Sequence, residues 1–343
     1  MNLIDLGWNQ DFADKLARLE IKEGFKIARV AVEYKGMYKL YTEGGEVLAE
    51  ITGKMRYNNQ FPAVGDWVVI DLLDNGERAI IHKILPRKSK FSRKVAGGDI
   101  KEQVVAANID TVFIVTSLNQ DFNLRRLERY LTLAWNSGAR PVIILSKADL
   151  MEKPESKEAE VGTVAPGVPV HIVSSVTGRG LAELKQYLNR GKTTALLGSS
   201  GVGKSTIINQ LMGSNKMEVK EIRVSDGRGR HTTTHRELIL LEGGGVVIDN
   251  PGMREIQLWD DSEGFDESFD DIKALADNCK FNDCQHETEP GCAVKEAIAA
   301  GELTEKRLES YRKLKRELLY MERKRKYGSE HANKLKIQEL MGL

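Results

Sequence analysis

The stretch TTALLGSSGVGKSTIINQLM, residues 193–212, decides the fold of this 343-residue chain. It has the pattern of an apolar strand, a glycine-rich turn and a helix, and the turn from Gly198 to Ser205 matches G-x-x-x-x-G-K-[ST]. Glycines let backbone N–H groups close around phosphates where side chains would clash. Lys204 would neutralise the β- and γ-phosphates, and the Ser205 hydroxyl would coordinate Mg²⁺. Because the flanking strand and helix are in place, a chance glycine-rich loop is a poor explanation, and we predict a nucleotide-phosphate site.

The surrounding domain, residues 100–260, repeats the same alternation. Apolar strands such as DTVFIVTS (110–117), PVIILS (141–146) and GVVID (245–249) are separated by helical patterns. This alternation predicts an α/β domain with a mostly parallel sheet covered on both faces. The residues expected around the phosphates are Gly198, Ser199, Ser200, Gly201, Val202, Gly203, Lys204, Ser205, Thr206 and Gly252.

Asp249 ends an apolar strand about fifty residues after the phosphate loop. Its carboxylate would lie next to the Mg²⁺, and the N–H of Gly252 would reach the γ-phosphate. An ordinary strand-ending turn is the alternative interpretation of this segment.

Two segments point to guanine as the base. Ser146-Lys147-Ala148-Asp149 follows an apolar strand and resembles the guanine-recognition motif of GTPases. In that motif the Asp accepts hydrogen bonds from two N–H groups on the Watson–Crick edge of guanine, a pair that adenine lacks, and the Lys stem covers the base. Ser174 and Ser175 end the next strand and resemble the fifth GTPase element, whose backbone N–H contacts the guanine oxygen. A Lys-x-Asp after a strand is weak by itself, so the combination carries the prediction.

The order of these motifs is unusual, because the base motifs at Lys147 and Ser174 precede the phosphate loop and Asp249 comes last. This is a circular permutation of the common GTPase order. Together with a barrel before the domain and a cysteine cluster after it, the chain resembles the ribosome small-subunit-dependent GTPase A family, the permuted YjeQ/RsgA type, over about residues 25 to 320.

The resemblance implies a GTPase that hydrolyses GTP to GDP and phosphate while acting in late maturation of the small ribosomal subunit. It implies the subunit and its rRNA as partners, with hydrolysis stimulated by the subunit and followed by release. It further implies a cytoplasmic monomer that uses Mg²⁺ with GTP and one structural Zn²⁺.

The Gly- and Arg-rich stretch 227–235 resembles the family's first switch. There we assign Thr233 to the Mg²⁺ shell with Ser205 and Asp249, keeping Thr232 and Thr234 open. Ras-like GTPases follow the carboxylate motif with a water-orienting Gln, but Met253 stands at the adjacent position. By resemblance, His231 takes that task, and the catalytic residues are His231, Lys204 and Thr233. The alternative for His231 is a solvated loop histidine.

Two positions depart from the family pattern. Ser146 stands where Asn is usual, and because that Asn ties the base site to the phosphate loop, we expect a lower nucleotide affinity. Asn250 stands where Thr or Ser is common, which is peripheral to the chemistry.

All three cysteines of the chain fall between Cys279 and Cys292, with His286 among them. An odd, clustered set argues against a disulfide framework. The ligands Cys279, Cys284, His286 and Cys292 supply three thiolates and one imidazole, enough for a closed tetrahedral Zn²⁺ site of structural type. The alternatives are a catalytic zinc and free thiols without metal.

Around the α/β domain we predict three further parts of the chain. They are an N-terminal lead, meaning the segment before the barrel, at 1–24, a barrel at 25–95 and a zinc-binding helical domain at 261–343. Short strands of period two, including one over residues 46–55, predict an OB-like barrel. This barrel is either a purely structural domain or an oligonucleotide-binding domain. The basic residues and Tyr57 at its edges favour oligonucleotide binding. The charged helix over 302–326 is either a solvated helix or an RNA contact.

Charge and hydropathy bound the class of protein. The chain carries 51 Lys and Arg against 50 Asp and Glu, so any basic surface must be local. Residues 251–300 carry 4 basic and 13 acidic side chains, and 301–343 carry 12 and 7, so an acidic stretch masks a basic tail. No apolar run is long enough for a membrane span and the start lacks a secretory pattern, so we expect a cytoplasmic protein.

The main alternative from another class is an RNA-binding protein that uses guanine nucleotide only as a conformational ligand. Hydrolysis of bound GTP in a single turnover would distinguish the two. A kinase-like phosphotransferase is disfavoured by Lys147 and Asp149 and by the lack of an identifiable acceptor site.

Overall fold

The computed structural model describes residues 1–21, 23–94, 102–213, 236–249 and 262–341. In chain order the strands are β1 (Lys26–Glu33), β2 (Tyr38–Thr42), β3 (Gly45–Ile51), β4 (Trp67–Leu73), β5 (Arg78–Ile84), β6 (Lys90–Lys94), β7 (Glu102–Ala107), β8 (Thr111–Ser117), β9 (Arg140–Ser146), β10 (Val170–Ile172), β11 (Thr193–Leu197), β12 (Glu237–Leu240) and β13 (Val246–Asp249). The helices are α1 (Gln10–Ala17), α2 (Gly53–Tyr57), α3 (Leu124–Ser137), α4 (Glu155–Gly162), α5 (Leu181–Leu184), α6 (Lys204–Met212), α7 (Ser262–Ser268), α8 (Asp270–Ala276), α9 (Ala293–Ala299) and α10 (Glu305–Met341), with 3-10 turns at Asp74–Gly76, Ala148–Leu150 and Lys185–Tyr187.

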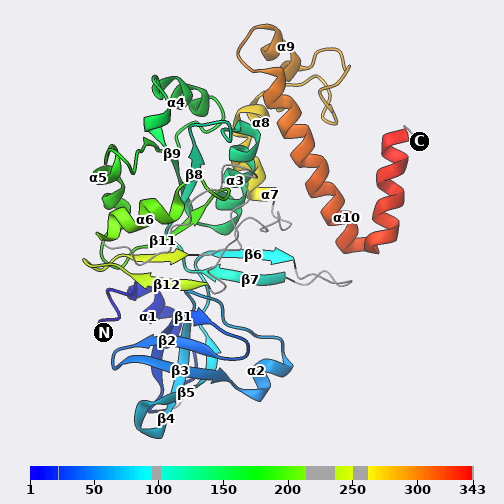
Figure 1. Cartoon of the computed structure of the whole chain (residues 1–343). Helices are drawn as coiled ribbons and strands as arrows, with labels where there is room; N and C mark the ends of the chain where they lie inside the picture. The colour runs from blue at the N-terminus through cyan, green and yellow to red at the C-terminus, as the bar shows by residue number, and fades with distance from the viewer. Residues whose placement is uncertain (22, 95–101, 214–235, 250–261, 342–343) are drawn as a thin grey trace.

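The first five strands close into a barrel, at the bottom of Figure 1. Strand β1 pairs with both β2 and β4, and β3 pairs in parallel with β5, so the order around the barrel is β1-β2-β3-β5-β4. Inward side chains from alternate positions, such as Val30, Leu40 and Ile81, fill the interior without exposed surface. The OB-type barrel predicted from the period-two pattern is confirmed.

The strand expected over 46–55 is wrong in its last residues. It ends at Ile51, and Thr52 then caps the short helix α2 by accepting the N–H of Met55 on Oγ1 at 3.2 Å. Threonine is a favoured N-cap, and Met55 is buried in the barrel at 3% exposure. The chain therefore becomes helical after Thr52, and Met55 still reaches the barrel core.

The α/β part has five parallel strands in the order β10-β9-β8-β11-β13, with β12 antiparallel at the edge. All seven residues of β8 are buried, as expected for a strand in the middle of a parallel sheet with both faces covered. This confirms the parallel sheet. Strand β12 also pairs with β1 of the barrel, so one sheet of eleven strands runs through both parts.

The side chain of Arg29 joins the barrel to the α/β part. It projects from β1, is 1% exposed, and donates to the carbonyls of Gly65 and Asn108 at 3.2 Å each, and to that of Leu6. Its guanidinium also lies over the ring of Trp67, 5.5 Å from the centroid. Burial lowers the pKa of Arg29 to about 10, so the group stays charged at neutral pH. Three segments distant in sequence are thus held by one cation.

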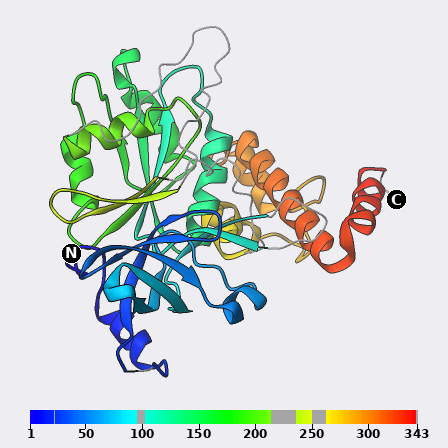
Figure 2. The same ribbon diagram turned by 60° about the horizontal axis from the view of Figure 1, so that its bottom comes forward.

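A second buried arginine fixes the C-terminal part. Arg307 on α10, 4% exposed, pairs with Glu128 of α3 at 2.7 Å and with Asp271 of α8 at 2.9 Å. It also donates to the carbonyl of Ser268 at 2.7 Å. Further along α10, Glu317 still pairs with Arg129 of α3 at 2.8 Å, and Figures 1 and 2 show the C-terminal end of α10 leaving the body of the molecule.

Helix α10 is longer than the helix expected over 302–326. It runs to Met341, with non-helical backbone at Gly328 where the helix bends. In the part of the chain that the structure describes, no helix combines the length and the apolar character that a membrane span requires.

We expect Arg29→Met to lower the free energy of unfolding by about 3 kcal/mol, because the carbonyls of Leu6, Gly65 and Asn108 each lose a buried hydrogen bond from the guanidinium. Denaturant titration followed by circular dichroism measures this. The matched control is Arg78→Met, whose exposed ion pair with Glu50 contributes about 0–1 kcal/mol. Equal losses in the two variants would contradict the role given to Arg29.

Candidate nucleotide and metal sites

The phosphate loop connects β11 to α6 and adopts backbone conformations that need glycine. A Cβ on Gly198 would lie 2.3 Å from the carbonyl oxygen of Val115, and Gly203 caps α6 with φ of +96°. The Lys204 ammonium donates to the carbonyls of Gly198 and Ser199 at 2.8 and 2.6 Å, so it lies folded across the loop. Loop, lysine and helix N-terminus have the arrangement that binds nucleotide phosphates.

Asp249 lies at the same edge of the sheet as the phosphate loop. Its strand β13 pairs in parallel with β11, with Thr193 opposite Val246 and Ala195 opposite Ile248. The carboxyl ends of neighbouring parallel strands meet at one edge, where ligands of such sheets bind. Asp249 and Ser205 therefore supply a carboxylate and a hydroxyl at one edge, a donor set suited to Mg²⁺.

The base motif follows β9. Lys147 takes a left-handed conformation with φ of 58°, which turns the chain into the 3-10 turn that carries the exposed Asp149. The hydroxyl of Ser174, a residue only 1% exposed, donates to the Asp149 carboxylate at 2.5 Å. The carboxylate is thus held in place before any base arrives.

The two serines after β10 differ in what they can offer a base. The backbone N–H of Ser174 donates to the carbonyl of Arg179 at 3.0 Å. Within the described residues, the N–H of Ser175 makes no hydrogen bond, so Ser175 is the one with a main-chain donor to spare.

Ser146 links the base motif to the phosphate loop. Its buried hydroxyl lies 2.6 Å from the carbonyl oxygen of Val202 and 3.2 Å from that of Thr116. The link that we expected this serine to weaken is present. An Asn amide carries two polar atoms, whereas a serine carries one hydroxyl. At position 146 that hydroxyl is already engaged by the Val202 carbonyl of the phosphate loop.

Several predicted residues lie outside the described part of the chain. These are His231, Thr232, Thr233, Thr234, Asn250, Gly252 and Met253. The first four fall between α6 and β12, and the last three between β13 and α7.

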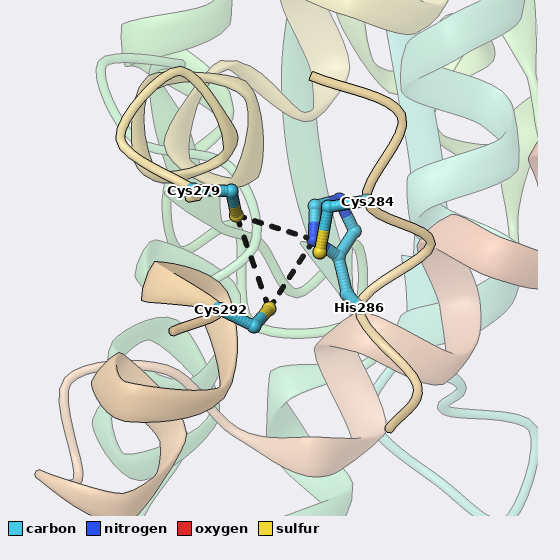
Figure 3. Close-up of side chains that lie close together, drawn as sticks. All are labelled: Cys279, Cys284, His286 and Cys292. Atoms are coloured by element: carbon cyan, nitrogen blue, oxygen red, sulfur yellow. Dashed lines mark hydrogen bonds between the residues drawn. The ribbon is translucent and has the colours of Figure 1, made fainter. Parts of the chain in front are cut away.

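The metal cluster is assembled by the loop between α8 and α9 (Figure 3). Polar atoms of Cys279, Cys284, His286 and Cys292 all lie within 4.8 Å of one another. The His286 Nδ1 is 3.6 Å from the Cys279 sulfur and 3.4 Å from that of Cys292, and these two sulfurs are 3.9 Å apart. A tetrahedron with metal–sulfur bonds of about 2.3 Å has edges of about 3.8 Å, so the donor set and spacing fit Zn²⁺.

The surroundings of the cluster shift the pKa values of two of its ligands. Burial, followed by the cations of Lys315 and Arg312, lowers the pKa of His286, which keeps the imidazole neutral and able to bind a metal. Desolvation, with the neighbouring thiols, raises the pKa of Cys284 to about 11. Metal binding must therefore displace thiol protons.

Glu289 shapes the loop that carries the ligands, which we did not anticipate. Its carboxylate accepts the backbone N–H groups of Gln285 and Glu287 at 2.7 Å and that of Thr288 at 2.9 Å. These backbone hydrogen bonds lower the pKa of Glu289 to about 2. A single acidic residue in an acidic segment gives no sequence signal of this role.

These sites define a P-loop GTPase whose base motifs precede its phosphate loop. A family model for the RsgA GTPase matches residues 84–259. A protein of Lactiplantibacillus plantarum named small ribosomal subunit biogenesis GTPase RsgA 2 is 46% identical over 330 residues, covering 95% of this chain and 92% of that one. The chain belongs to the RsgA GTPase family and is a GTP-hydrolysing enzyme.

Two solved structures support the permuted fold. YjeQ from Thermotoga maritima superposes with a TM-score of 0.65 at 30% identity, covering 86% of this chain and 99% of that one. YloQ, described as a circularly permuted GTPase, gives 0.62 at 25% identity, covering 88% and 97%. The expected circular permutation, with a barrel before and a Cys₃His cluster after, is confirmed.

We expect Cys292→Ser to reduce bound zinc from about one per chain to near zero, because one of four ligands is lost. Elemental analysis after dialysis measures the metal. Thr288→Ala is the control in the same loop, since its exposed side chain holds no ligand. Zinc-free wild type, or zinc retained in Cys292→Ser, would refute the assignment.

Proposed function

We propose that this GTPase binds the small ribosomal subunit, acts in its late maturation and is released when GTP is hydrolysed. The observation that carries the proposal is the 46% identity, over 95% of the chain, to a relative whose name places it in biogenesis of that subunit. The protein works as a monomer in the cytoplasm, and its partners are the subunit and its rRNA.

Guanine is selected at the edge where β9 and β10 end. Asp149 accepts the two N–H groups on the Watson–Crick edge of the base, and Ser174 holds its carboxylate. The Lys147 stem covers the base, and Ser175 donates its free N–H to the guanine oxygen. Ser146 keeps this edge in register with the phosphate loop.

The phosphates occupy the loop between β11 and α6. Residues 198–206 surround them with backbone N–H groups, and Lys204 leaves its loop carbonyls to contact the β- and γ-phosphates. Gly252 reaches the γ-phosphate. Mg²⁺, when bound with GTP, supplies charge neutralisation there, and Ser205, Asp249 and Thr233 are the side chains that hold it.

Hydrolysis needs a residue that orients water, and His231 takes that role as acceptor or proton relay. The subunit stimulates this step, so the isolated enzyme is slow. The segment after Asp249 leads directly into α7 and the zinc-binding part, so loss of the γ-phosphate is transmitted there. The zinc is structural, because its four ligands leave no open position.

The basic part of α10 contacts rRNA phosphates. Lys313, Arg316 and Lys326 are exposed on it, whereas Arg312 donates to the carbonyl of His286 and therefore serves the zinc loop. Exposed cations along one helix suit binding to the phosphate backbone.

Purified small subunits should raise the GTP turnover of the wild-type protein at least tenfold, and His231→Ala should lower the stimulated rate by about 10²-fold while GTP binding is kept. Phosphate release measures the turnover, and titration with a fluorescent nucleotide measures GTP binding. Equal turnover with and without subunits would refute the subunit's role. The alternative, a binding protein that uses nucleotide only as a ligand, predicts intact GTP after a single-turnover incubation.

A further inference from the structure

The α2 segment, residues 52–61, exposes two aromatic and two basic side chains on the surface of the barrel. Tyr57 is 88% exposed and Phe61 49% exposed, which is unusual for aromatic side chains. Lys54 and Arg56 are also exposed, as are the amides at 58–60. Nothing in the fold described above uses these outward side chains.

The backbone under these side chains is fixed. Met55 anchors α2 in the barrel core, the N–H of Gln60 donates to the Met55 carbonyl at 2.8 Å, and that of Asn59 donates to the Arg56 carbonyl at 3.2 Å. Arg87, itself paired with Asp66, donates to the carbonyl of Phe61 at 3.5 Å. A surface held this way loses little conformational entropy on binding a partner.

The charge of the segment selects the kind of partner. Residues 52–65 contain no Asp or Glu. Neither Lys54 nor Arg56 forms an ion pair with a carboxylate in the described ranges of the chain, so both cations are available to phosphates. Cations beside flat aromatic rings and amides are the combination that binds unpaired nucleotides.

The surface that OB barrels commonly use for oligonucleotides is less suited here. That surface lies over the second and third strands. On the outer side of β3 stand Glu46 and Glu50, which pair with Lys39 at 2.7 Å and with Arg78 at 3.4 Å. Because Lys39 and Arg78 are already paired with these carboxylates, they are less available to phosphates than Lys54 and Arg56, so the α2 segment is the better site.

We propose that the α2 segment binds unpaired nucleotides of RNA, with Tyr57 stacking on one base, Phe61 on another, and Lys54 and Arg56 contacting phosphates. This rests on the proposed function, since the RNA is that of the subunit. In Figures 1 and 2, α2 projects from the barrel on the side on which α10 leaves the body. Both elements proposed to bind RNA therefore lie on the same side of the molecule.

The test uses the full-length protein and a fluorescently labelled single-stranded RNA of about 12 nucleotides, within the span of one OB barrel. Tyr57→Ala should weaken binding about tenfold, and Tyr57→Phe, which keeps the stacking ring, should stay within about twofold of wild type. Leu48→Ala removes an apolar side chain of 46% exposure from β3 and should change nothing.

A double variant, Lys54→Gln with Arg56→Gln, tests the phosphate contacts. It should reduce the slope of log affinity against log salt by about 1.4, since each phosphate contact to a single strand contributes about 0.7. Phe61→Ala provides a second aromatic variant, expected to weaken binding like Tyr57→Ala.

Unchanged RNA affinity in both aromatic variants would overturn the proposal, as would equal wild-type affinity for a duplex of the same length. Loss of subunit-stimulated turnover in Tyr57→Ala with RNA affinity intact would also overturn it and would identify a protein contact instead. Failure of the proposed function is measured separately, as the absence of subunit-stimulated GTP turnover in the wild-type protein.

Discussion

The buried guanidinium of Arg29 is the contact on which the relative placement of the domains depends. Burying a cation is costly unless its donors are satisfied, and here carbonyls from the N-terminal lead, the barrel and the start of the α/β part satisfy them together. The pairing of β1 with β12 crosses the same junction, and the Tyr41 hydroxyl donates to the Leu238 carbonyl at 3.3 Å. Barrel and α/β sheet therefore behave as one unit.

The C-terminal part is attached on the same principle. Arg307 is buried against Glu128 and Asp271, and Arg129 of α3 binds Glu317 of α10 through two bonds of 2.9 and 2.8 Å. The loop that brings Cys279, Cys284, His286 and Cys292 together adds a ligand set that fits Zn²⁺ next to this contact. Both flanking domains are fixed to the α/β part. We therefore expect a structural change at the γ-phosphate to be transmitted to both of them.

The circular permutation places the expected γ-phosphate-sensing segments next to both flanking domains. The segments expected to sense the γ-phosphate precede β12 and follow β13. Strand β12 is paired with the barrel, and the chain after β13 enters α7 of the C-terminal part, which packs beside α3 of the α/β part. Each sensing segment is thus connected directly to one of the two domains proposed to contact RNA.

Local motifs could be predicted from the sequence because neighbouring residues suffice to define them. The phosphate loop needs only its glycines, Lys204 and the flanking strand and helix, and the metal cluster needs only four ligands within one short loop. The base motif is predicted from Lys147 and Asp149 together with Ser174 and Ser175, each pair standing after an apolar strand, and it stays a prediction.

Contacts between distant segments could not be predicted in the same way. The link from Ser146 to Val202 spans three strands of the folded sheet, and the roles of Arg29 and Arg307 depend on partners far along the chain. The helix at Gly53–Tyr57 was missed because its apolar Met55 continued the period-two pattern of β3. Glu289 acts through backbone groups, which carry no residue-type signal.

The central claim is that a guanine-specific site stands at the carboxyl edge of the permuted sheet, with Asp149 as its reader. Titrating Asp149→Asn with guanosine and xanthosine diphosphates tests it most directly, because an Asn amide can donate to the second carbonyl that xanthine has in place of guanine's amine. The account predicts a loss of guanosine affinity of about 10²-fold, as two charge-assisted hydrogen bonds are removed, and a preference for xanthosine. A variant that still prefers guanosine would contradict it.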